Sequence, residues 1–409
     1  RKKLHAVLTE FGLTQAAADG QIYLWHHPGT SPSVDGKASS RRVRMCLSTH
    51  VDDLKGASTR ADAEKLLTFL EKAVGNCSQE WKEFTHTGIE HVQSDKGVYT
   101  HQSKYADQLV PMVISELKGQ PDENPAEGDF QSKYMSLLGG LAWLVLTRVD
   151  LAVYVQALQR HTHAPRVVDC KRLNTVVRYA RRKRVGILYR PLDLDKLCVT
   201  VFSDAAFKAT PEESSGLALR GCVVLLAEAR SHELISPEGN CHLLEYVCRR
   251  QRRVVRSTYS AELNGLIDSV EITLLVQFML HQLYRGTDQS STQLARAQED
   301  GQLYPVVKAA TDAMAVFSSV AAPDICDPAE SSLKLHLLSL RDKVASGTLQ
   351  SLFWSDTRDM LADGLTKGSV NRLALQMCAE HGKHVLTLSL IHISEPTRQE
   401  AISYGRVWV

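Results

Sequence analysis

The sequence predicts a protein of mixed α+β or α/β class, and two observations support this prediction. From about residue 193 onward, three strand-like runs are followed by a helix, a strand, a helix, a strand and a helix. This order suits a mixed five-stranded sheet covered by helices. The first 115 residues contain shorter strand-like runs around an amphipathic stretch at residues 61–74. The length of 409 residues allows two or three domains.

The N-terminal elements follow from the pattern of apolar and polar residues. Residues 61–74 place Leu66, Leu70 and Val74 on one face of a helix. A polar loop at residues 27–40 separates two of the expected strands. The expected strands lie at residues 21–25, 43–50, 84–92 and 97–101.

The middle of the chain is expected to be helical. The segment GQPDENPAEGDFQ at residues 119–131 is rich in proline, glycine and acidic residues, a composition typical of a linker. Two helical stretches are expected after it, at residues 134–161 and 167–184. Residues 116–192 are therefore interpreted as a linker with a helical region.

The C-terminal part contains longer and more apolar strand-like runs. The expected strands lie at residues 196–204, 216–228, 242–248, 304–312 and 349–356. The expected helices lie at about residues 260–283, 335–344 and 359–368.

Two basic runs occur in a chain whose net charge is only +2. Residues 171–190 contain eight basic residues and residues 249–256 contain five, with no acidic residue in either run. Such runs indicate contact with a polyanion such as nucleic acid, and the alternative for each is a solvated face. The candidate nucleic-acid-binding residues are Lys171, Arg172, Arg178, Arg181, Arg182, Arg252 and Arg253.

Cysteine usage and hydropathy indicate an intracellular protein, and the finer expectation of a cytoplasmic particle or the nucleus is implied by the resemblance described below. The nine cysteines form no CxxC pair, which argues for a reducing compartment and against a disulfide scaffold. Cys378, His381 and His384 are expected at a surface helix end, with a metal site as the less favoured alternative. No apolar stretch is expected to span a membrane and no signal peptide is visible, so we expect no membrane partner. The chain begins at Arg1 and is expected to be a fragment of a longer product.

Four carboxylates occupy corresponding positions in the C-terminal part. Asp204 and Asp312 end expected strands, Glu262 begins the long helix, and Asp363 lies in the last helix. Because the ends of neighbouring strands meet at one edge of a sheet, we expect these side chains to converge on two Mg²⁺ ions, with Mn²⁺ as a substitute. Such ions clamp the attacking and leaving oxygens of phosphoryl transfer. Each acid alone also fits a turn or a helix terminus.

Six segments carry a resemblance to a known family. They are VDD at 51–53, TGIEHVQSDKGVYTHQSKYADQL at 87–109, YMSLLGGLAWLVLTRVDLAVYV at 134–155, FSDAAF at 202–207, STYSAEL at 257–263 and LADGLTK at 361–367. Together and in this order they resemble the pol polyprotein of copia-type retrotransposons, in which a reverse transcriptase is followed by ribonuclease H. The resemblance covers about residues 4–375.

The resemblance implies three regions and one nuclease activity. Residues 1–115 resemble a truncated reverse-transcriptase palm, residues 116–192 the thumb or connection, and residues 193–387 a ribonuclease H-like domain. The family's catalytic and metal-binding acids correspond to Asp204, Glu262, Asp312 and Asp363. The implied activity is two-metal hydrolysis of the RNA strand of an RNA–DNA hybrid, which would be bound through its backbone and groove shape.

The resemblance also assigns Asp52 and Asp53 to part of a polymerase metal site. The family needs a third aspartate on an upstream strand, which this sequence lacks, and His50 replaces the family's tyrosine. We therefore expect no polymerase activity from this fragment. The first alternative is an inactive remnant of a decayed element that only binds nucleic acid. The second is an integrase- or transposase-like nuclease with three acids.

The last segment, residues 388–409, does not resemble the family. Its stretch LSLIHISEPTRQEAISYG at 388–405 resembles an in-frame translation of a sequencing-library adapter. We expect this segment to be a non-native and poorly packed tail.

Overall fold

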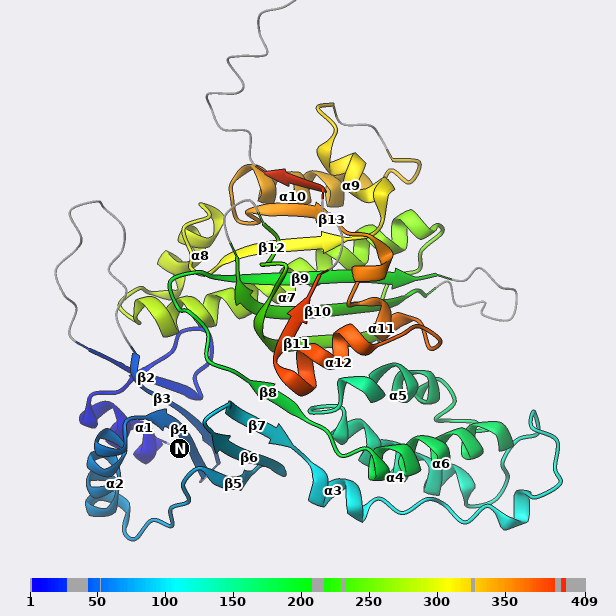
Figure 1. Cartoon of the computed structure of the whole chain (residues 1–409), viewed down its shortest axis with the longest axis horizontal. Helices are drawn as coiled ribbons and strands as arrows, with labels where there is room; N and C mark the ends of the chain where they lie inside the picture. The colour runs from blue at the N-terminus through cyan, green and yellow to red at the C-terminus, as the bar shows by residue number, and fades with distance from the viewer. Residues whose placement is uncertain are drawn as a thin grey trace, which may run out of the picture.

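The structure is built on three β-sheets with helices packed against them (Figure 1). The computed structural model describes residues 2–27, 43–51, 53–207, 217–229, 233–324, 328–386 and 391–394. Two four-stranded sheets are formed mainly by the first half of the chain, and one seven-stranded sheet is formed by the second half. The expected class, an α+β protein with a mixed sheet, is confirmed.

The first sheet is antiparallel and shares one apolar core with two helices. Its elements are α1 (Lys2–Phe11), β1 (Thr14–Gln15), β2 (Ile22–His26), β3 (Val43–His50), β4 (Asp53–Ser58) and α2 (Arg60–Val74), with the strands in the order β1-β2-β3-β4. Thr59 caps the N-terminus of α2, because its side chain accepts a hydrogen bond from the amide of Asp62. Leu66 and Leu70 project from α2 into the core, as their helical spacing predicts.

The second sheet is antiparallel and takes its last strand from much later in the chain. Its strands are, in order, β5 (Glu83–His86), β6 (Ile89–Ser94), β7 (Gly97–His101) and β8 (Ile187–Tyr189). The single strand expected at residues 84–92 is a hairpin instead. Thr87 and Gly88 turn the chain with φ angles of +49° and +76°, values that suit a tight hairpin. Gly97 lets β8 approach, since a Cβ at this position would lie 2.0 Å from the carbonyl oxygen of Tyr189.

The helical region lies between β7 and β8 in the chain. It contains α3 (Ser103–Gln108), η1 (Ser115–Leu117), α4 (Phe130–Leu144), η2 (Val149–Leu151), α5 (Ala152–Gln159) and α6 (Val167–Arg182). The one helix expected at residues 134–161 is divided into α4, η2 and α5. Arg148 lies at the break, where its buried guanidinium binds Asp150 and the carbonyl groups of Ala180 and Lys183. These hydrogen bonds tie the break to the C-terminal end of α6.

The third sheet is mixed and has seven strands. They are β9 (Leu197–Ala206), β10 (Leu219–Glu228), β11 (Glu238–Arg250), β12 (Val306–Thr311), β13 (Ser351–Trp354), β14 (Lys383–Val385) and β15 (Ile391–Ser394). Their order is β14-β11-β10-β9-β12-β13-β15, and β12 runs parallel to both β9 and β13. The five strands expected from the sequence are the central ones. The two edge strands are too short for their side-chain alternation to be recognised in a sequence.

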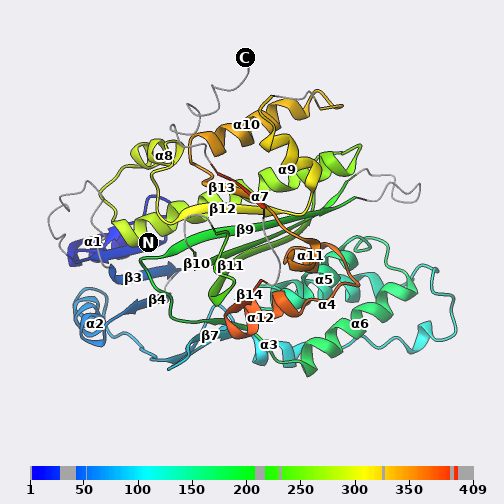
Figure 2. The same cartoon turned by 45° about the horizontal axis from the view of Figure 1, so that its top comes forward.

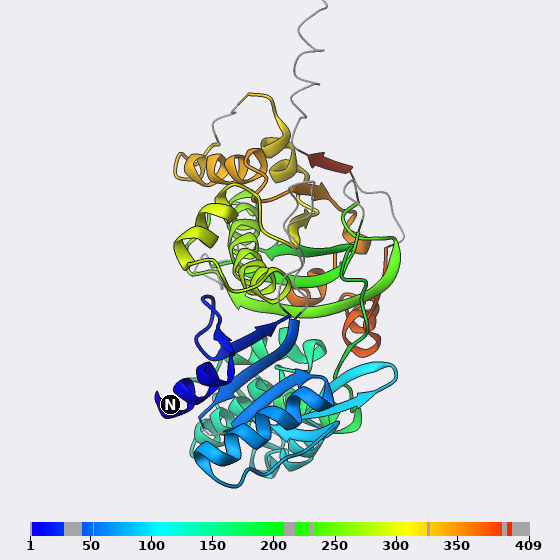
Figure 3. The same ribbon diagram turned by 90° about the vertical axis from the view of Figure 1, so that its left-hand side faces the viewer.

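Helices cover both faces of the seven-stranded sheet (Figures 2 and 3). These are α7 (Thr258–Arg285), α8 (Ser291–Glu299), α9 (Met314–Ala321), α10 (Leu333–Ala345), η4 (Thr357–Asp359), α11 (Asp363–Thr366) and α12 (Leu373–His381). Along β9, Val199 and Val201 point to the core shared with α7, α9 and α10. The alternate residues Cys198 and Phe202 point to the core shared with α11 and α12. The two faces of one strand therefore belong to two separate cores.

The long helix α7 is apolar enough to span a membrane by length and composition alone. The expectation that no segment has this property is therefore corrected. Half of its most apolar window is buried, and α7 contacts β9, β10 and β12 directly. Near its C-terminal end, the Gln282 side chain accepts a hydrogen bond of 3.0 Å from the amide of Ala18, next to the first sheet. These contacts account for its apolar composition as that of a core helix.

The last segment of the chain contributes one described element. Strand β15 pairs antiparallel with β13, Ile391 lying opposite Trp354. The other residues of the segment 388–409 lie outside the described residues. The expectation of a poorly packed tail therefore concerns residues that are mostly not described.

Candidate active site

Two aspartates lie side by side where central strands of the third sheet end. Asp204 is near the end of β9, and Asp312 directly follows β12, the parallel neighbour of β9. Thr311 pairs with Ser203, and the residue that follows each of them is an aspartate. Parallel pairing with this register brings both carboxylates to the same edge of the sheet.

Glu262 reaches this edge from helix α7. The helix begins at Thr258 and is capped by Ser257, whose side chain accepts a hydrogen bond from the amide of Ser260. Glu262 therefore lies in the second turn, not in the first turn where the sequence places it. Its carboxylate accepts a hydrogen bond of 3.0 Å from the amide of Ala205, which fixes it beside the end of β9.

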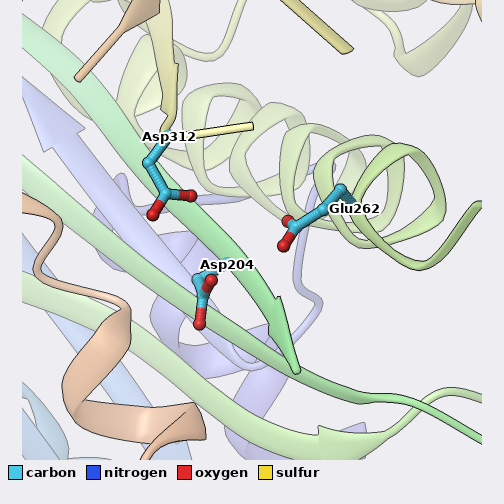
Figure 4. A group of neighbouring side chains, drawn as sticks. All are labelled: Asp204, Glu262 and Asp312. Carbon is cyan, nitrogen blue, oxygen red and sulfur yellow. The ribbon is translucent and has the colours of Figure 1, made fainter. Parts of the chain in front are cut away.

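The three carboxylates form one compact group (Figure 4). One oxygen each from Asp204, Glu262 and Asp312 lies within 4.8 Å of the other two. Burial, followed by the charges of Asp204 and Asp312, raises the pKa of Glu262 to about 9. Burial and the charge of Asp204 also raise the pKa of Asp312. A divalent cation would offset this repulsion, and three carboxylate oxygens suit Mg²⁺ or Mn²⁺.

Asp363 is connected to this group through a lysine. The Lys367 ammonium lies 2.6 Å from a carboxylate oxygen of Asp363 and 3.4 Å from one of Asp204. The pKa of Asp363 is about 6, raised mainly by burial and lowered in part by its hydrogen bond to Lys367. The structure thus brings Asp204, Glu262 and Asp312 together, and it places Asp363 next to Asp204 with an ammonium bound to both.

Helix α11 approaches Asp204 closely because the neighbouring strand has a glycine there. Gly221 of β10 lies opposite Asp204 in the sheet. A Cβ at Gly221 would lie 2.8 Å from the carbonyl oxygen of Ala362 and 2.8 Å from the Thr366 side chain. The Thr366 hydroxyl donates a hydrogen bond to Asp204. The glycine therefore makes room for the element that carries Asp363 and Lys367.

The Asp52–Asp53 pair lies far from this group in the chain, at the turn between β3 and β4. Asp52 lies outside the described residues. Asp53 is exposed at the start of β4, opposite His50. Among the residues that the structure describes, the carboxylates grouped closely enough to hold a metal do not include Asp53.

The first set of basic residues lies on helix α6. Lys171 forms an ion pair of 2.7 Å with Asp122, and Arg172 lies 4.0 Å from Asp169. The remaining candidates on this helix are exposed, and they are Arg178, Arg181 and Arg182. This helix belongs to the helical region and is not part of the seven-stranded sheet.

The second set of basic residues lies at the same sheet edge as the carboxylate group. Arg250 pairs with Leu219, which in turn pairs with Ala206 at the end of β9. The exposed side chains of Arg252 and Arg253 follow in the segment that leads into α7. A guanidinium nitrogen of Arg253 contacts the His336 ring on α10. This segment therefore follows directly from the sheet edge that carries Asp204.

Three polar residues near the site were not identified as site residues from the sequence. Thr357 donates a hydrogen bond of 3.1 Å to Asp312, Thr366 donates to Asp204, and Lys367 binds Asp204 and Asp363. For Lys367 the sequence does contain a signal, since it follows Asp363 by four residues and side chains at this spacing meet on a helix. The partners of the two threonines are distant in the chain and give no local signal.

The stretch containing Cys378, His381 and His384 differs from its expected surface position. Cys378 and His384 are buried, whereas His381 is exposed. His384 is held by a hydrogen bond between its ring and the carbonyl group of Ser236. The eight cysteines that the structure describes are free thiols.

Comparisons with known proteins give distant likenesses. No family model matches the sequence. The uncharacterized mitochondrial protein AtMg00810 of Arabidopsis thaliana is 24% identical over 246 residues, which cover 56% of this chain and 93% of that protein. The name of this relative assigns no activity.

Two solved structures of the foamy viral protease-reverse transcriptase, both in complex with double-stranded DNA, are also similar. One has a TM-score of 0.40 at 10% identity, and the alignment covers 76% of this chain and 46% of that one. The other has a TM-score of 0.39 at 12% identity, with coverage of 76% and 55%. The chain spans about half the length of each.

Proposed function

We propose that residues 193–387 form a metal-dependent ribonuclease H that hydrolyses the RNA strand of RNA–DNA hybrids. We further propose that the chain derives from a copia-type retrotransposon. The observation that carries the proposal is the convergence of Asp204, Glu262 and Asp312 at one edge of a mixed sheet. The ordered motifs FSDAAF, STYSAEL and LADGLTK support it, because they contain Asp204, Glu262 and Asp363, respectively.

The donor set supports a magnesium or manganese site. Asp204, Glu262 and Asp312 would hold one ion, and the second ion of a two-metal mechanism would need Asp204 and Asp363. When bound, such ions activate the attacking water and stabilise the leaving 3′ oxygen. The chain's own contribution is to fix the ligands. The Ala205 amide orients Glu262, and the hydroxyls of Thr357 and Thr366 orient the two aspartates.

The basic segment before α7 would bind the sugar–phosphate backbone of the hybrid. Arg252 and Arg253 are exposed at the sheet edge that carries the carboxylates, so a duplex bound there would reach both. Backbone contacts by arginine position a duplex without reading its sequence. The exposed arginines of α6 are proposed as a second, more distant contact, and we propose that the helical region to which they belong is the thumb or connection.

The first 115 residues are proposed to be a remnant of a reverse-transcriptase palm without polymerase activity. Asp53 is exposed and lies outside the described carboxylate group. Mg²⁺ usually requires several carboxylates or substrate phosphates, and among the described residues no other carboxylate is grouped with Asp53 closely enough to hold it. This proposal rests on the VDD motif and on the strand turn that carries it.

The proposal is tested with the full chain and an RNA–DNA hybrid labelled on the RNA strand. We expect Mg²⁺-dependent cleavage of the RNA strand. Asp204→Asn should reduce its rate by at least about 100-fold, since losing even a group that only orients a metal ligand costs about 10- to 100-fold. Glu262→Gln should have a similar effect. Glu271→Gln is the matched control, because Glu271 lies exposed on the same helix.

Two outcomes would contradict the nuclease proposal. Cleavage that survives Asp204→Asn would show that another site or a contaminant is responsible. Salt-sensitive binding of the hybrid without cleavage would favour the alternative of an inactive remnant that only binds nucleic acid.

A further inference from the structure

The ammonium group of Lys367 lies within the acidic site. Its nitrogen is 2.6 Å from an oxygen of Asp363 and 3.4 Å from an oxygen of Asp204. Asp204 is 2% exposed and Asp363 is 7% exposed, so these two carboxylates have little access to solvent. The lysine is therefore the cation that these two carboxylates share in the folded chain.

The lysine divides the acidic site into two unequal halves. Asp204 contributes to both, because it is grouped with Glu262 and Asp312 and also binds Lys367. The half formed by Asp204, Glu262 and Asp312 has three carboxylates, and among them Asp204 is the one that Lys367 contacts. The half formed by Asp204 and Asp363 already contains a positive charge. A divalent ion needs oxygens at about 2.0–2.1 Å, so it cannot bind between Asp204 and Asp363 while the ammonium remains there.

Several contacts hold the lysine in this position. Thr366, its neighbour in the chain, donates a hydrogen bond to Asp204. The guanidinium of Arg372 binds the carbonyl groups of Gly364 and Lys367 and so fixes both ends of the short helix α11. The lysine is thus presented by a restrained backbone. Its position does not depend only on the flexibility of a long side chain.

We propose that the Lys367 ammonium occupies the position of a second divalent ion, between Asp204 and Asp363. Without nucleic acid, the folded chain then binds one divalent ion, at Asp204, Glu262 and Asp312, and the lysine excludes a second one from Asp204 and Asp363. This inference rests on the proposed metal-dependent function but concerns the number of ions, which cleavage assays do not measure.

The test is a Mn²⁺ titration of the full chain without nucleic acid, followed by the electron paramagnetic resonance signal of free Mn²⁺. We expect one bound ion in the wild-type chain. Lys367→Met should bind two, because removing the ammonium frees Asp204 and Asp363, and its second ion should bind at least about 10-fold more tightly than any second ion of the wild type. Lys367→Arg keeps the charge and should still bind one ion. Lys118→Met removes an exposed lysine elsewhere and is the matched control, expected to bind one ion.

The outcomes separate this inference from the proposed function. Two ions of similar affinity in the wild-type chain would overturn the lysine inference whatever the variants do, and would leave the nuclease proposal standing. One ion in a folded Lys367→Met variant, with an unchanged circular dichroism spectrum, would also overturn the inference alone. No bound ion in the wild type would overturn both. Asp204→Asn, which removes the carboxylate common to both halves, should abolish binding of the ion.

Discussion

The buried carboxylate of Glu262 links folding stability to pH. Its pKa is about 9 in the folded chain, against an ordinary value of 4.5, because burial and two neighbouring carboxylates oppose its charge. Between these values the folded state holds a proton that the unfolded state has released. The free energy of unfolding therefore falls as the pH rises through this window. The decrease is at most about 1.4 kcal/mol for each pKa unit by which the folded and unfolded values differ.

We expect the melting temperature of the metal-free chain to fall as the pH is raised from about 5 to about 9. Glu262→Gln should flatten this dependence, because its amide does not ionise. Added Mg²⁺ should restore stability most at high pH, where the ionised carboxylates bind it best. The measurement is thermal unfolding in chelator across this pH range, with Glu271→Gln as the control. An equally steep dependence in Glu262→Gln would contradict the assignment.

At the scale of single elements, the position of α11 depends on the absence of a side chain at Gly221 in the neighbouring strand β10. Its N-cap residue Ala362 and its last residue Thr366 approach β10 at Gly221, where any side chain would collide with them. The glycine therefore affects the site through packing, although it carries no functional group. Its neighbours Asp204 and Lys367 depend on the position of α11.

Gly221→Ala should displace α11 and destabilise the chain by about 1–3 kcal/mol, the usual cost of overpacking a well-filled interior. It should also weaken Mn²⁺ binding, because Asp204 loses its hydrogen bond from Thr366. Gly139→Ala is the control. Apart from the nearby backbone of its own helix α4, no atom lies within 4 Å of a Cβ at Gly139. That change should raise stability by about 0.5–1 kcal/mol. Unfolding in denaturant measures the free energy of unfolding of both variants. Equal stability of Gly221→Ala and the wild type would show that a side chain at position 221 does not collide with α11.

The elements also show how far the sequence alone predicts this molecule. Asp204 and Asp312 were recognisable because each lies near or directly after the end of a buried strand, and a parallel register then brings them together. The turn at Thr87 and Gly88 does have a local signal, since a glycine inside an expected strand indicates a break in it. The contact of Lys367 with Asp363 has a local signal in its spacing of four residues, but its contact with Asp204, 163 residues away in the chain, has none. Contacts of this kind are set by tertiary packing and leave no local pattern.

At the scale of the whole molecule, the charge distribution matters more than the net charge of +2. Arg252 and Arg253 are exposed at the edge that carries the grouped carboxylates, whereas the basic residues of α6 belong to another region. A duplex bound over the carboxylates would meet the first set directly. Contact with the second set would require a longer duplex.

We expect hybrid affinity to fall linearly with the logarithm of salt concentration, because binding of phosphates by basic side chains releases counterions. The double change Arg252→Ala and Arg253→Ala should reduce the slope by about 1 for each phosphate that is no longer neutralised, and it should weaken binding regardless of sequence. Arg296→Ala, which removes an exposed arginine from α8, is the control. The measurement is fluorescence anisotropy with a labelled hybrid at several salt concentrations. An unchanged slope in the double variant would exclude these arginines from the interface.

The position of β8 in the second sheet has a consequence for how the molecule is assembled. Strand β7 ends at His101 and its neighbour β8 begins at Ile187, and Thr100 pairs with Ile187. Adjacent antiparallel strands need only a short turn to connect them, yet here the entire helical region intervenes. That region is thus an insertion whose two ends meet at one point of the sheet. Folding of its helices offsets the loop-closure entropy that would otherwise oppose pairing of these two strands. The sheet and the helical region therefore form a cooperative unit, in which loss of the helices would open the sheet edge.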